Sequence, residues 1–417
     1  MLTVGVLGAG GFVGSRIVEQ FHLLGTARVV PIVRSFSALA RPSRFAIETR
    51  MADALDKEAL TKAFAGCDVV VNAVLGPYNQ IVAEPPAIYG AAEAAKVRRL
   101  IHISTASVHG QAPEPGTDET SVLRTDQPFP YNNAKVIAEQ KLRALRKRGR
   151  VELVMLRPGI VFGPRDIWIA GIARALSQGK AYLVDGGRGI CNTIYIDNLV
   201  HAVRLALEAP VDGEAFLVGD SETITWADIH RWVAVALGDC PPARIVHDPK
   251  IIPAQRALLD RLRGIPYWKA AMQQVPPRVK DRGRDMLGLL KGAAAGMNEA
   301  RRQRTSSDWV LSAGNIDAVP LETAMLHRCR YKFPFAKARR LLNYEPVVSV
   351  EEGLIRSIRA LSLAGYVIER DFHLKLAKTK PVRHSEDPVK PAAPAVSTTV
   401  SEALNAARYE TRFSTIE

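Results

Sequence analysis

The stretch VGVLGAGGFVG, residues 4–14, runs from a short apolar segment directly into a cluster of glycines. An apolar strand, a tight glycine turn and a following helix are the arrangement in which a parallel βαβ unit binds a dinucleotide. Gly8 permits the turn, Gly11 lets the backbone approach a pyrophosphate, and Gly14 lets the helix pack closely on the strand. The turn therefore predicts that the backbone here, including Phe12 and Val13, holds phosphates at the start of a helix.

Downstream of this turn, short apolar segments alternate with segments of helical spacing. The expected strands are residues 3–7, 29–33, 68–72, 100–103 and 153–156, and the expected helices are 15–24, 56–64, 87–95 and 133–145. Such alternation produces a parallel sheet covered on both faces. The sequence therefore predicts an α/β protein: a doubly wound parallel-sheet Rossmann domain with a smaller, mostly helical C-terminal substrate domain and a disordered tail.

The 417 residues are enough for two or three domains. We assign residues 1–240 to NAD(P) binding, with substrate-pocket segments from about 159, and 241–370 to a substrate or cap domain. Residues 371–417 are expected to form a largely disordered tail, since from about residue 375 the chain is polar and rich in Pro and Ala. This division confines the predicted chemistry mainly to the first part of the chain.

Composition restricts the class of protein further. A hydrophobic content of 47% excludes a wholly disordered chain, and the 4 cysteines are too scattered for a disulfide framework or a metal cluster. The sequence contains neither an apolar run of about 18 residues nor a basic, signal-like start. We therefore expect a cytoplasmic protein without a metal.

The net charge of +14 comes largely from residues 250–304, which hold 13 Lys and Arg against four acidic residues. Trp268 stands beside Lys269 in this segment, as in segments that lie on anionic lipid. We therefore consider peripheral contact with an anionic membrane, at its inner face, for residues 250–304. The alternatives are a lid that supplies arginines to a phosphorylated ligand and a solvated helical cap. No nucleic acid is expected, because the aromatic residues do not interleave with the basic ones.

The end of the second expected strand bears on the choice of dinucleotide. Enzymes that use NAD usually place an acidic residue there for the ribose hydroxyl, whereas this chain has Arg34, with Arg41 and Arg44 beyond it. A guanidinium matches a 2′-phosphate, so NADP is the expected cofactor and NAD the alternative. Asp53 is a candidate to bind the adenine amino group, although a surface helix cap has the same appearance.

Polar residues with acid–base character follow two later elements. Thr105 lies in a hydroxyl-rich cluster directly after an apolar strand, and Tyr131 precedes Lys135 by four residues, on one face of a helix. A nearby ammonium favours a phenolate, so Lys135 is expected to lower the pKa of Tyr131. Tyr131 is then a candidate general acid and base for a carbonyl or alcohol, and Thr105 is a candidate to polarise the same oxygen. The expected substrates are small molecules.

The motifs GAGGFVG, ISTASVHG, YNNAK and RPGIVFGP together resemble the extended short-chain dehydrogenase/reductase family, in its NAD-dependent epimerase/dehydratase branch. The resemblance covers roughly residues 1–240 and 333–360. It implies that Thr105, Tyr131 and Lys135 are catalytic and that Lys135 also binds the cofactor, at the nicotinamide ribose hydroxyls. It further implies that the backbone around Pro158 lines the nicotinamide, that Asn72 lies along the cofactor, and that two copies pair as a homodimer.

The chain differs from many family members at residues that contact the substrate, so the motifs do not decide which substrate it binds. Members that act on sugar nucleotides usually have Asn where this chain has Ile160 and often have Arg near Cys191. We nevertheless expect, first, an oxidoreductase or epimerase of a sugar nucleotide or related phosphorylated sugar. The alternatives are a reductase or dehydrogenase of a hydrophobic, sterol-like alcohol or ketone, and a non-catalytic NADP-binding sensor. Dehydration is disfavoured because Thr105 lacks the adjacent acidic residue that dehydratases of this family carry.

Overall fold

The computed structural model of the protein describes residues 1–238, 240–252 and 318–374. Met1–Phe372 form one compact unit. The predictions for residues 250–304 and 371–417 lie outside the described residues, except for the first few of each. The predicted boundary at residue 240 stays a prediction. In the described part of the chain, no helix is both long and apolar enough to cross a membrane.

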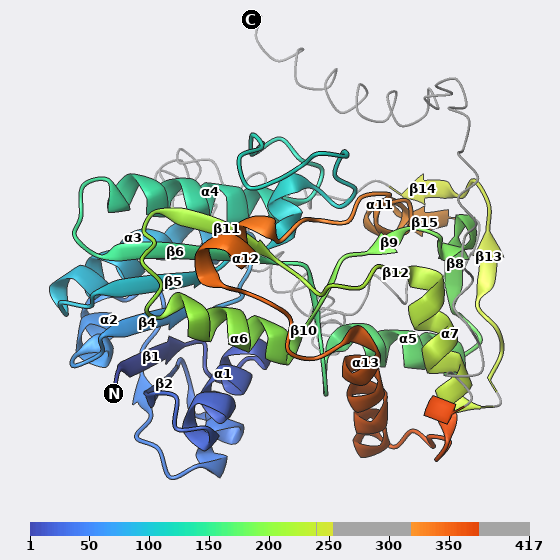
Figure 1. Cartoon of the computed structure of the whole chain (residues 1–417), viewed down its shortest axis with the longest axis horizontal. Coiled ribbons are helices and arrows are strands. Elements are labelled where there is room, and N and C mark those ends of the chain that lie inside the picture. Colours follow the sequence, from blue (N-terminus) through green and yellow to red (C-terminus); the bar gives the residue numbers. More distant parts are fainter. Residues whose placement is uncertain (239, 253–317, 375–417) are drawn as a thin grey trace, which may run out of the picture. The chain divides into compact units, whose positions relative to one another are not determined.

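The centre of the fold is a parallel sheet of seven strands, in the order β11-β6-β5-β4-β1-β2-β3. The strand order changes direction between β1 and β4, and such a switch point opens a crevice at the carboxyl ends of the strands. The fold class that the alternation predicts is confirmed (Figure 1). The strands are β1 (Thr3–Leu7), β2 (Arg28–Val33), β3 (Arg50–Met51), β4 (Val69–Asn72), β5 (Arg99–Ile103), β6 (Glu152–Pro158) and β11 (Glu214–Val218).

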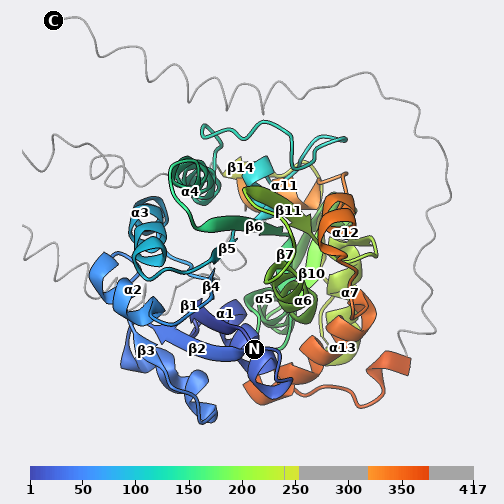
Figure 2. The same cartoon turned by 60° about the vertical axis from the view of Figure 1, so that its left-hand side comes forward.

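Helices cover both faces of this sheet, as Figure 2 shows. One face packs on side chains such as Ile17 and Leu199, and the other on Phe64 and Leu142, all of them buried. Central strands with apolar residues on both faces require this double cover. The first face carries α1 (Phe12–Leu23), α6 (Ile196–Ala206) and α12 (Ala336–Leu342), and the second carries α2 (Lys57–Phe64), α3 (Tyr78–Ala94) and α4 (Pro130–Arg146).

Helix α3 differs most from the prediction, because it begins at Tyr78 instead of residue 87. Pro85 and Pro86 lie inside it, where proline removes a backbone donor and normally breaks a helix. The carbonyl of Val82 loses its usual partner four residues on, and the Lys141 ammonium of α4 donates to it at 2.7 Å. A hydrogen bond between α3 and α4 thus replaces a backbone hydrogen bond within α3. The local sequence of α3 does not reveal this contact, because Lys141 lies on the other helix.

Beyond the main sheet, the chain builds small two-stranded pairs and further helices. Asp166 caps α5 by accepting from Ile169 N at 2.7 Å, and Thr225 forms a capping box with Asp228 at the start of α7. These helices pack on each other. The elements are β7 (Ile160–Phe162), β8 (Tyr182–Val184), β9 (Ile190–Cys191), β10 (Thr193–Tyr195), β12 (Ile224–Thr225), β13 (Arg244–Val246), β14 (Lys250–Ile252), β15 (Ala318–Pro320), α5 (Ile167–Ser177), α7 (Trp226–Leu237), α11 (Leu321–His327) and α13 (Val350–Arg359).

Candidate active site

The glycine turn lies at the switch point, between β1 and α1. Gly8 has φ +84°, and a Cβ there would come within 2.9 Å of the Ala73 carbonyl. A Cβ on Gly14 would lie 2.3 Å from the Gly8 oxygen, and one on Gly10 would lie 2.6 Å from the Ala38 oxygen. These close backbone approaches explain why three of the residues must be glycine.

Helix α1 begins at Phe12, after Gly11, and no side chain caps its N-terminus. The backbone N–H groups of the first turn, including those of Phe12 and Val13, therefore remain available to an anion. Free backbone N–H groups at a helix N-terminus, beside a turn with no room for side chains, suit the pyrophosphate of a dinucleotide. The residues of the turn thus suit the cofactor that the sequence predicts.

The structure brings Thr105 and Tyr131 together. Thr105 follows β5 and begins a 3-10 turn at Ala106–His109, in which its hydroxyl accepts from Ser107 N at 3.2 Å. Tyr131 lies in the first turn of α4, and the Thr105 side chain acts on its hydroxyl and lowers its pKa. Two hydroxyls from separate elements therefore meet at the carboxyl end of β5.

Lys135 lies one helical turn beyond Tyr131 and is buried. Its Nζ donates to the carbonyl of Ile103 at 3.1 Å. Burial lowers the pKa of Lys135, while the carboxylates of Glu84 and Glu139 raise it. The ammonium is thus held in the protein interior by a carbonyl and two acidic neighbours.

The pKa of Tyr131 differs from the prediction. Although 37% of the residue surface is exposed, its hydroxyl lies among protein groups, and this burial raises the pKa to about 12. The Thr105 side chain lowers the pKa of Tyr131, and the nearby charge of Glu322 raises it. The predicted lowering by Lys135 is therefore wrong for this structure, because the Lys135 ammonium is directed to the Ile103 carbonyl. Tyr131 is a protonated phenol at neutral pH.

A buried ion pair between β6 and α4 lies next to the segment that carries Thr105. Arg157 on β6 donates to both carboxylate oxygens of Glu139 on α4, at 2.6 and 3.0 Å, and Ser104 donates to the same carboxylate at 2.6 Å. His109 Nε2 lies 3.1 Å from Arg157 Nη1. Burial and the Arg157 charge lower the pKa of His109 to about 4, so the ring is neutral near pH 7. This network joins β5, β6 and α4 at the position of Thr105.

A second buried cluster lies beside Lys135. Asn72 Nδ2 is 3.1 Å from His102 Nδ1 and 3.5 Å from Glu84 Oε1. Burial raises the pKa of Glu84 to about 7. The side chain of Asn72, predicted to lie along the cofactor, thus points into the protein, and Pro158 is buried at the end of β6. Sequence reasoning missed Glu84, whose one signal is an acid beside two prolines in an otherwise apolar segment.

The predicted residues for the adenosine end lie on surface loops. Arg34 is exposed just after β2, and Asp53 accepts from Leu55 N at 2.9 Å within a local turn. Arg41 lies near Arg165, and this like charge contributes to a lowered pKa of Arg41 behind the larger effect of burial. Arg165, which the sequence did not single out, has φ 73°. Among the residues that the structure describes, none of these three arginines forms an ion pair.

Arg165 belongs to a loop that lies against the glycine turn. A Cβ on Gly163 would come within 3.4 Å of the Phe12 ring, and Gly163 N donates to the Asp166 carboxylate at 3.0 Å. On the other side, the loop after β2 contacts Gly10 through Ala38. The loops that carry Arg41 and Arg165 therefore both border the predicted dinucleotide site.

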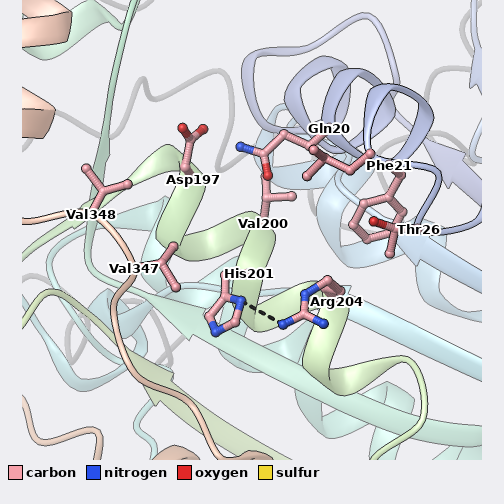
Figure 3. Close-up of a pocket in the computed structure, with 10 residues that line it drawn as sticks. Gln20, Phe21, Thr26, Asp197, Val200, His201, Arg204, Val347 and Val348 are labelled. Carbon is pink, nitrogen blue, oxygen red and sulfur yellow. Dashed lines mark hydrogen bonds between the residues drawn. The ribbon is translucent and has the colours of Figure 1, made fainter.

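The cavity drawn in Figure 3 lies elsewhere, between α1 and α6, with a volume of about 250 Å³. It is lined by residues such as Phe21, Val200 and His201 and by none of the predicted site residues. Asp197 on its rim is paired with Arg16 at 2.6 Å. This cavity shares no residue with the candidate active site, which is defined by the glycine turn, Thr105 and Tyr131.

The glycine turn, Thr105 and Tyr131 thus lie at one edge of the sheet, at the carboxyl ends of its strands. The family model described as "NAD dependent epimerase/dehydratase family" matches residues 4–219, which include all of these groups. The chain belongs to the NAD-dependent epimerase/dehydratase family, as the motifs predicted.

The relatives of this chain have several activities. The chain is 30% identical over 307 residues to a 3-diazoavenalumate denitrifying reductase of Streptomyces sp, a match that covers 68% of this chain and 94% of the relative. It is 24% identical to a decarboxylating sterol-4-alpha-carboxylate 3-dehydrogenase of Dictyostelium discoideum, over 54% of this chain and 74% of the relative. A solved UDP-glucose 4-epimerase of Thermotoga maritima has a TM-score of 0.58 at 18% identity, with 87% of this chain and 99% of that chain covered. This last likeness shows the fold alone.

Proposed function

We propose that this protein is an NADP-dependent oxidoreductase that interconverts a ketone and a secondary alcohol. The observation that carries the proposal is the position of Thr105, directly after β5, and of Tyr131, in the first turn of α4, at the same edge of the sheet as the glycine turn. Two hydroxyls that meet at one point can both bind a single carbonyl oxygen, and one of them can transfer a proton to it.

Each residue has a distinct role in this reaction. Thr105 donates a hydrogen bond that orients the substrate oxygen, and Tyr131 gives that oxygen a proton in the direction of reduction. The bound dinucleotide supplies the hydride. Lys135, one helical turn away, donates to the Ile103 carbonyl at 3.1 Å and holds α4 against the end of β5, where Thr105 follows.

The protonation state of Tyr131 favours reduction over oxidation in the absence of ligands. Burial raises the pKa of Tyr131 to about 12, so the phenol carries its proton at neutral pH. Reduction of a ketone consumes a proton, and a protonated acid at the substrate oxygen provides it. The extensively covered relative at 30% identity is also named a reductase, and this supports the same direction.

The preference for NADP rests on arginines near the adenosine end of the site. Arg34 follows β2, and Arg41 and Arg165 come from loops that border the glycine turn. None of the three forms an ion pair with a carboxylate of the described residues, and a free guanidinium group favours an anion such as the 2′-phosphate that distinguishes NADP from NAD. The test is the ratio of NADPH to NADH affinity in Arg34→Ala, which should fall about tenfold if one charge-assisted phosphate contact is lost. An unchanged ratio removes Arg34 from the proposal.

A sugar-nucleotide epimerase is the second candidate function, and Lys332 favours it. Cys191 stands near the place where sugar-nucleotide members of the family often carry an arginine, and it is buried. The Lys332 ammonium acts on Cys191 electrostatically and donates to the Glu222 carbonyl at 2.9 Å. A lysine could thus replace the missing arginine. An epimerase returns its cofactor to the starting redox state, whereas a reductase consumes NADPH in equal amount with substrate.

Replacing Tyr131 with phenylalanine tests the shared mechanism. We expect Tyr131→Phe to lower kcat by about 10²–10⁴-fold, the usual contribution of a general acid, while NADPH affinity stays unchanged. Tyr366→Phe, which removes a phenol remote from the site in sequence, is the matched control. Mass-spectrometric identification of small molecules that copurify with the protein provides the substrate for this assay. Full activity in Tyr131→Phe would refute the mechanism and leave a dinucleotide-binding sensor as the reading.

A further inference from the structure

Asn72 connects the glycine turn to a pair of buried titratable side chains. Its Oδ1 accepts from Val74 N at 3.1 Å, directly after β4. The backbone of Ala73 and Val74 lies against the turn, since a Cβ on Gly8 would come within 2.9 Å of the Ala73 carbonyl and 3.0 Å of Val74 N. Ala73 N also donates to the Leu7 carbonyl of β1 at 2.9 Å. The Asn72 side chain therefore holds the backbone that packs on the glycine turn.

The amide nitrogen of Asn72 is directed to the protein interior. Its Nδ2 lies 3.1 Å from Nδ1 of His102, the residue opposite Asn72 on β5, and 3.5 Å from Oε1 of Glu84 on α3. An amide NH₂ group can only donate, so both of these atoms accept from it, and the His102 ring is neutral. All three side chains belong to residues that are at most 2% exposed. Asn72 is thus held by one acceptor from the neighbouring strand and one from α3.

Glu84 is the member of this cluster whose charge changes near neutral pH. Its Oε2 and His102 Nε2 are buried and have no hydrogen-bond partner among the described residues. Burial raises the pKa of Glu84 to about 7, against the opposing effects of Lys135 on α4 and of Asn72, and Asp53 before α2 raises it further. Burial, followed by the charge of Lys135, keeps the pKa of His102 well below its usual range. Glu84 therefore titrates near pH 7 while His102 stays neutral.

We propose that Glu84 is a positioning residue for the dinucleotide: as a carboxylate it holds the Asn72 amide, and through Asn72 the backbone that packs on the glycine turn. An ionised acceptor forms a stronger hydrogen bond with an amide than a neutral carboxyl group does. The ionised form thus fixes Asn72 more firmly, and binding a dinucleotide then requires less ordering of the segment after β4. Affinity for the dinucleotide should rise as the pH rises through the pKa of Glu84. This inference rests on the proposed function, since it requires a dinucleotide at the glycine turn.

The test is the dissociation constant of NADPH, measured through nicotinamide fluorescence on the full-length protein between pH 6 and pH 8.5. Glu84→Gln keeps the size and an oxygen acceptor for Asn72 but cannot ionise. We expect both proteins to bind NADPH equally at pH 6, and the wild type to bind about three- to tenfold more tightly at pH 8.5, where the charge-assisted hydrogen bond forms. The ratio of the two constants at each pH removes the titration of the 2′-phosphate, which is common to both.

Two further variants show whether the effect is specific and whether it passes through Asn72. Glu93→Gln is the matched control, because Glu93 is exposed on the same helix and the change in net charge is the same. It should follow the wild type at every pH. Adding Glu84→Gln to Asn72→Ala should change the NADPH dissociation constant less than twofold at any pH, because the connection to the turn is already lost.

Three results would overturn the proposal. They are a ratio that stays constant with pH, tighter NADPH binding by Glu84→Gln at pH 8.5, and an effect of Glu84→Gln that persists undiminished in Asn72→Ala. The second would mean that the Glu84 charge repels the phosphates instead of ordering the backbone. Absence of NADPH binding by the wild type would overturn both this proposal and the proposed function, whereas full activity in Tyr131→Phe would overturn the proposed function alone.

Discussion

Replacing Arg157 with leucine removes the cation that balances the buried Glu139, on the helix that carries Tyr131 and Lys135. Arg157 is 1% exposed and Glu139 0%, and their side chains meet at 2.6 and 3.0 Å. Without the guanidinium, the carboxylate keeps only the Ser104 hydroxyl, at 2.6 Å, as a side-chain donor among the described residues. A buried charge that loses its partner must either stay ionised in the interior or take up a proton, and both states cost free energy.

We expect Arg157→Leu to lower the free energy of unfolding by about 3–5 kcal/mol, the typical cost of breaking a buried ion pair by removing one partner. In the wild type, Arg157 and Ser104 lower the pKa of Glu139 against the effect of burial. In the variant, burial raises that pKa above its unfolded value. The destabilisation is then complete above the folded pKa and declines as the pH falls toward the unfolded value of about 4.3.

The assay is urea unfolding followed by circular dichroism, at pH 5 and pH 8. Arg124→Leu is the control, because Arg124 and Asp126 form an exposed pair at 2.9 Å, and such pairs contribute about 0.2–1 kcal/mol. Adding Glu139→Leu to Arg157→Leu should restore part of the lost stability, since no unpaired charge remains. A loss for Arg157→Leu no larger than that for Arg124→Leu, or a loss that grows as the pH falls, would refute this reasoning.

Two further changes test the turn and the second buried cluster. Gly8→Ala should weaken NADPH binding at least tenfold and destabilise the fold by about 1–3 kcal/mol, since the new Cβ would lie 2.9 Å from Ala73 backbone atoms at φ +84°. Gly25→Ala, at φ +59° but in open space, should share only the backbone strain, so equal NADPH affinities in the two variants would contradict the steric argument. Glu84→Gln should gain stability over the wild type as the pH rises from about 4.5 to 7, because burial raises the Glu84 pKa to about 7 and the wild type must ionise that group in the interior. A pH-independent difference in unfolding free energy would show that Glu84 does not titrate in this window.

Local patterns were enough to predict most of the central sheet. The strand predicted at residues 3–7 is observed as β1 (Thr3–Leu7), and the helix predicted at 56–64 is observed as α2 (Lys57–Phe64). Both elements could be predicted from local residues. The strand is rich in β-branched residues, and the helix has Asp56 as its N-cap before a helical spacing of apolar residues. The start of α3 was missed, because its prolines are tolerated only through the contact between Lys141 and Val82 on neighbouring helices.

For the candidate active site, too, the sequence predicted some features and only the folded structure showed others. Thr105 and Tyr131 could be paired from the sequence, because Thr105 follows a strand and Tyr131 begins the next helix, and both positions lie at the carboxyl edge of a parallel sheet. The pKa of Tyr131 could not be predicted, since it depends on burial and on Glu322 rather than on the adjacent Lys135. Arg165 and Glu84 were likewise missed, since their relevance comes from loops and helices that meet only in the folded chain.

The sequence by itself determined that this protein has a parallel sheet, a glycine turn for a dinucleotide and a Tyr–Lys pair on one helix. Those features depend on neighbours within a few residues, where periodicity and backbone geometry act. Only the tertiary structure decided which groups balance the buried charge of Lys135, which carboxyl group raises the pKa of Tyr131, and which arginines lie on loops that border the glycine turn. These depend on burial and on contacts between residues as far apart as Gln111 and Glu322, and burial is a property of the whole fold.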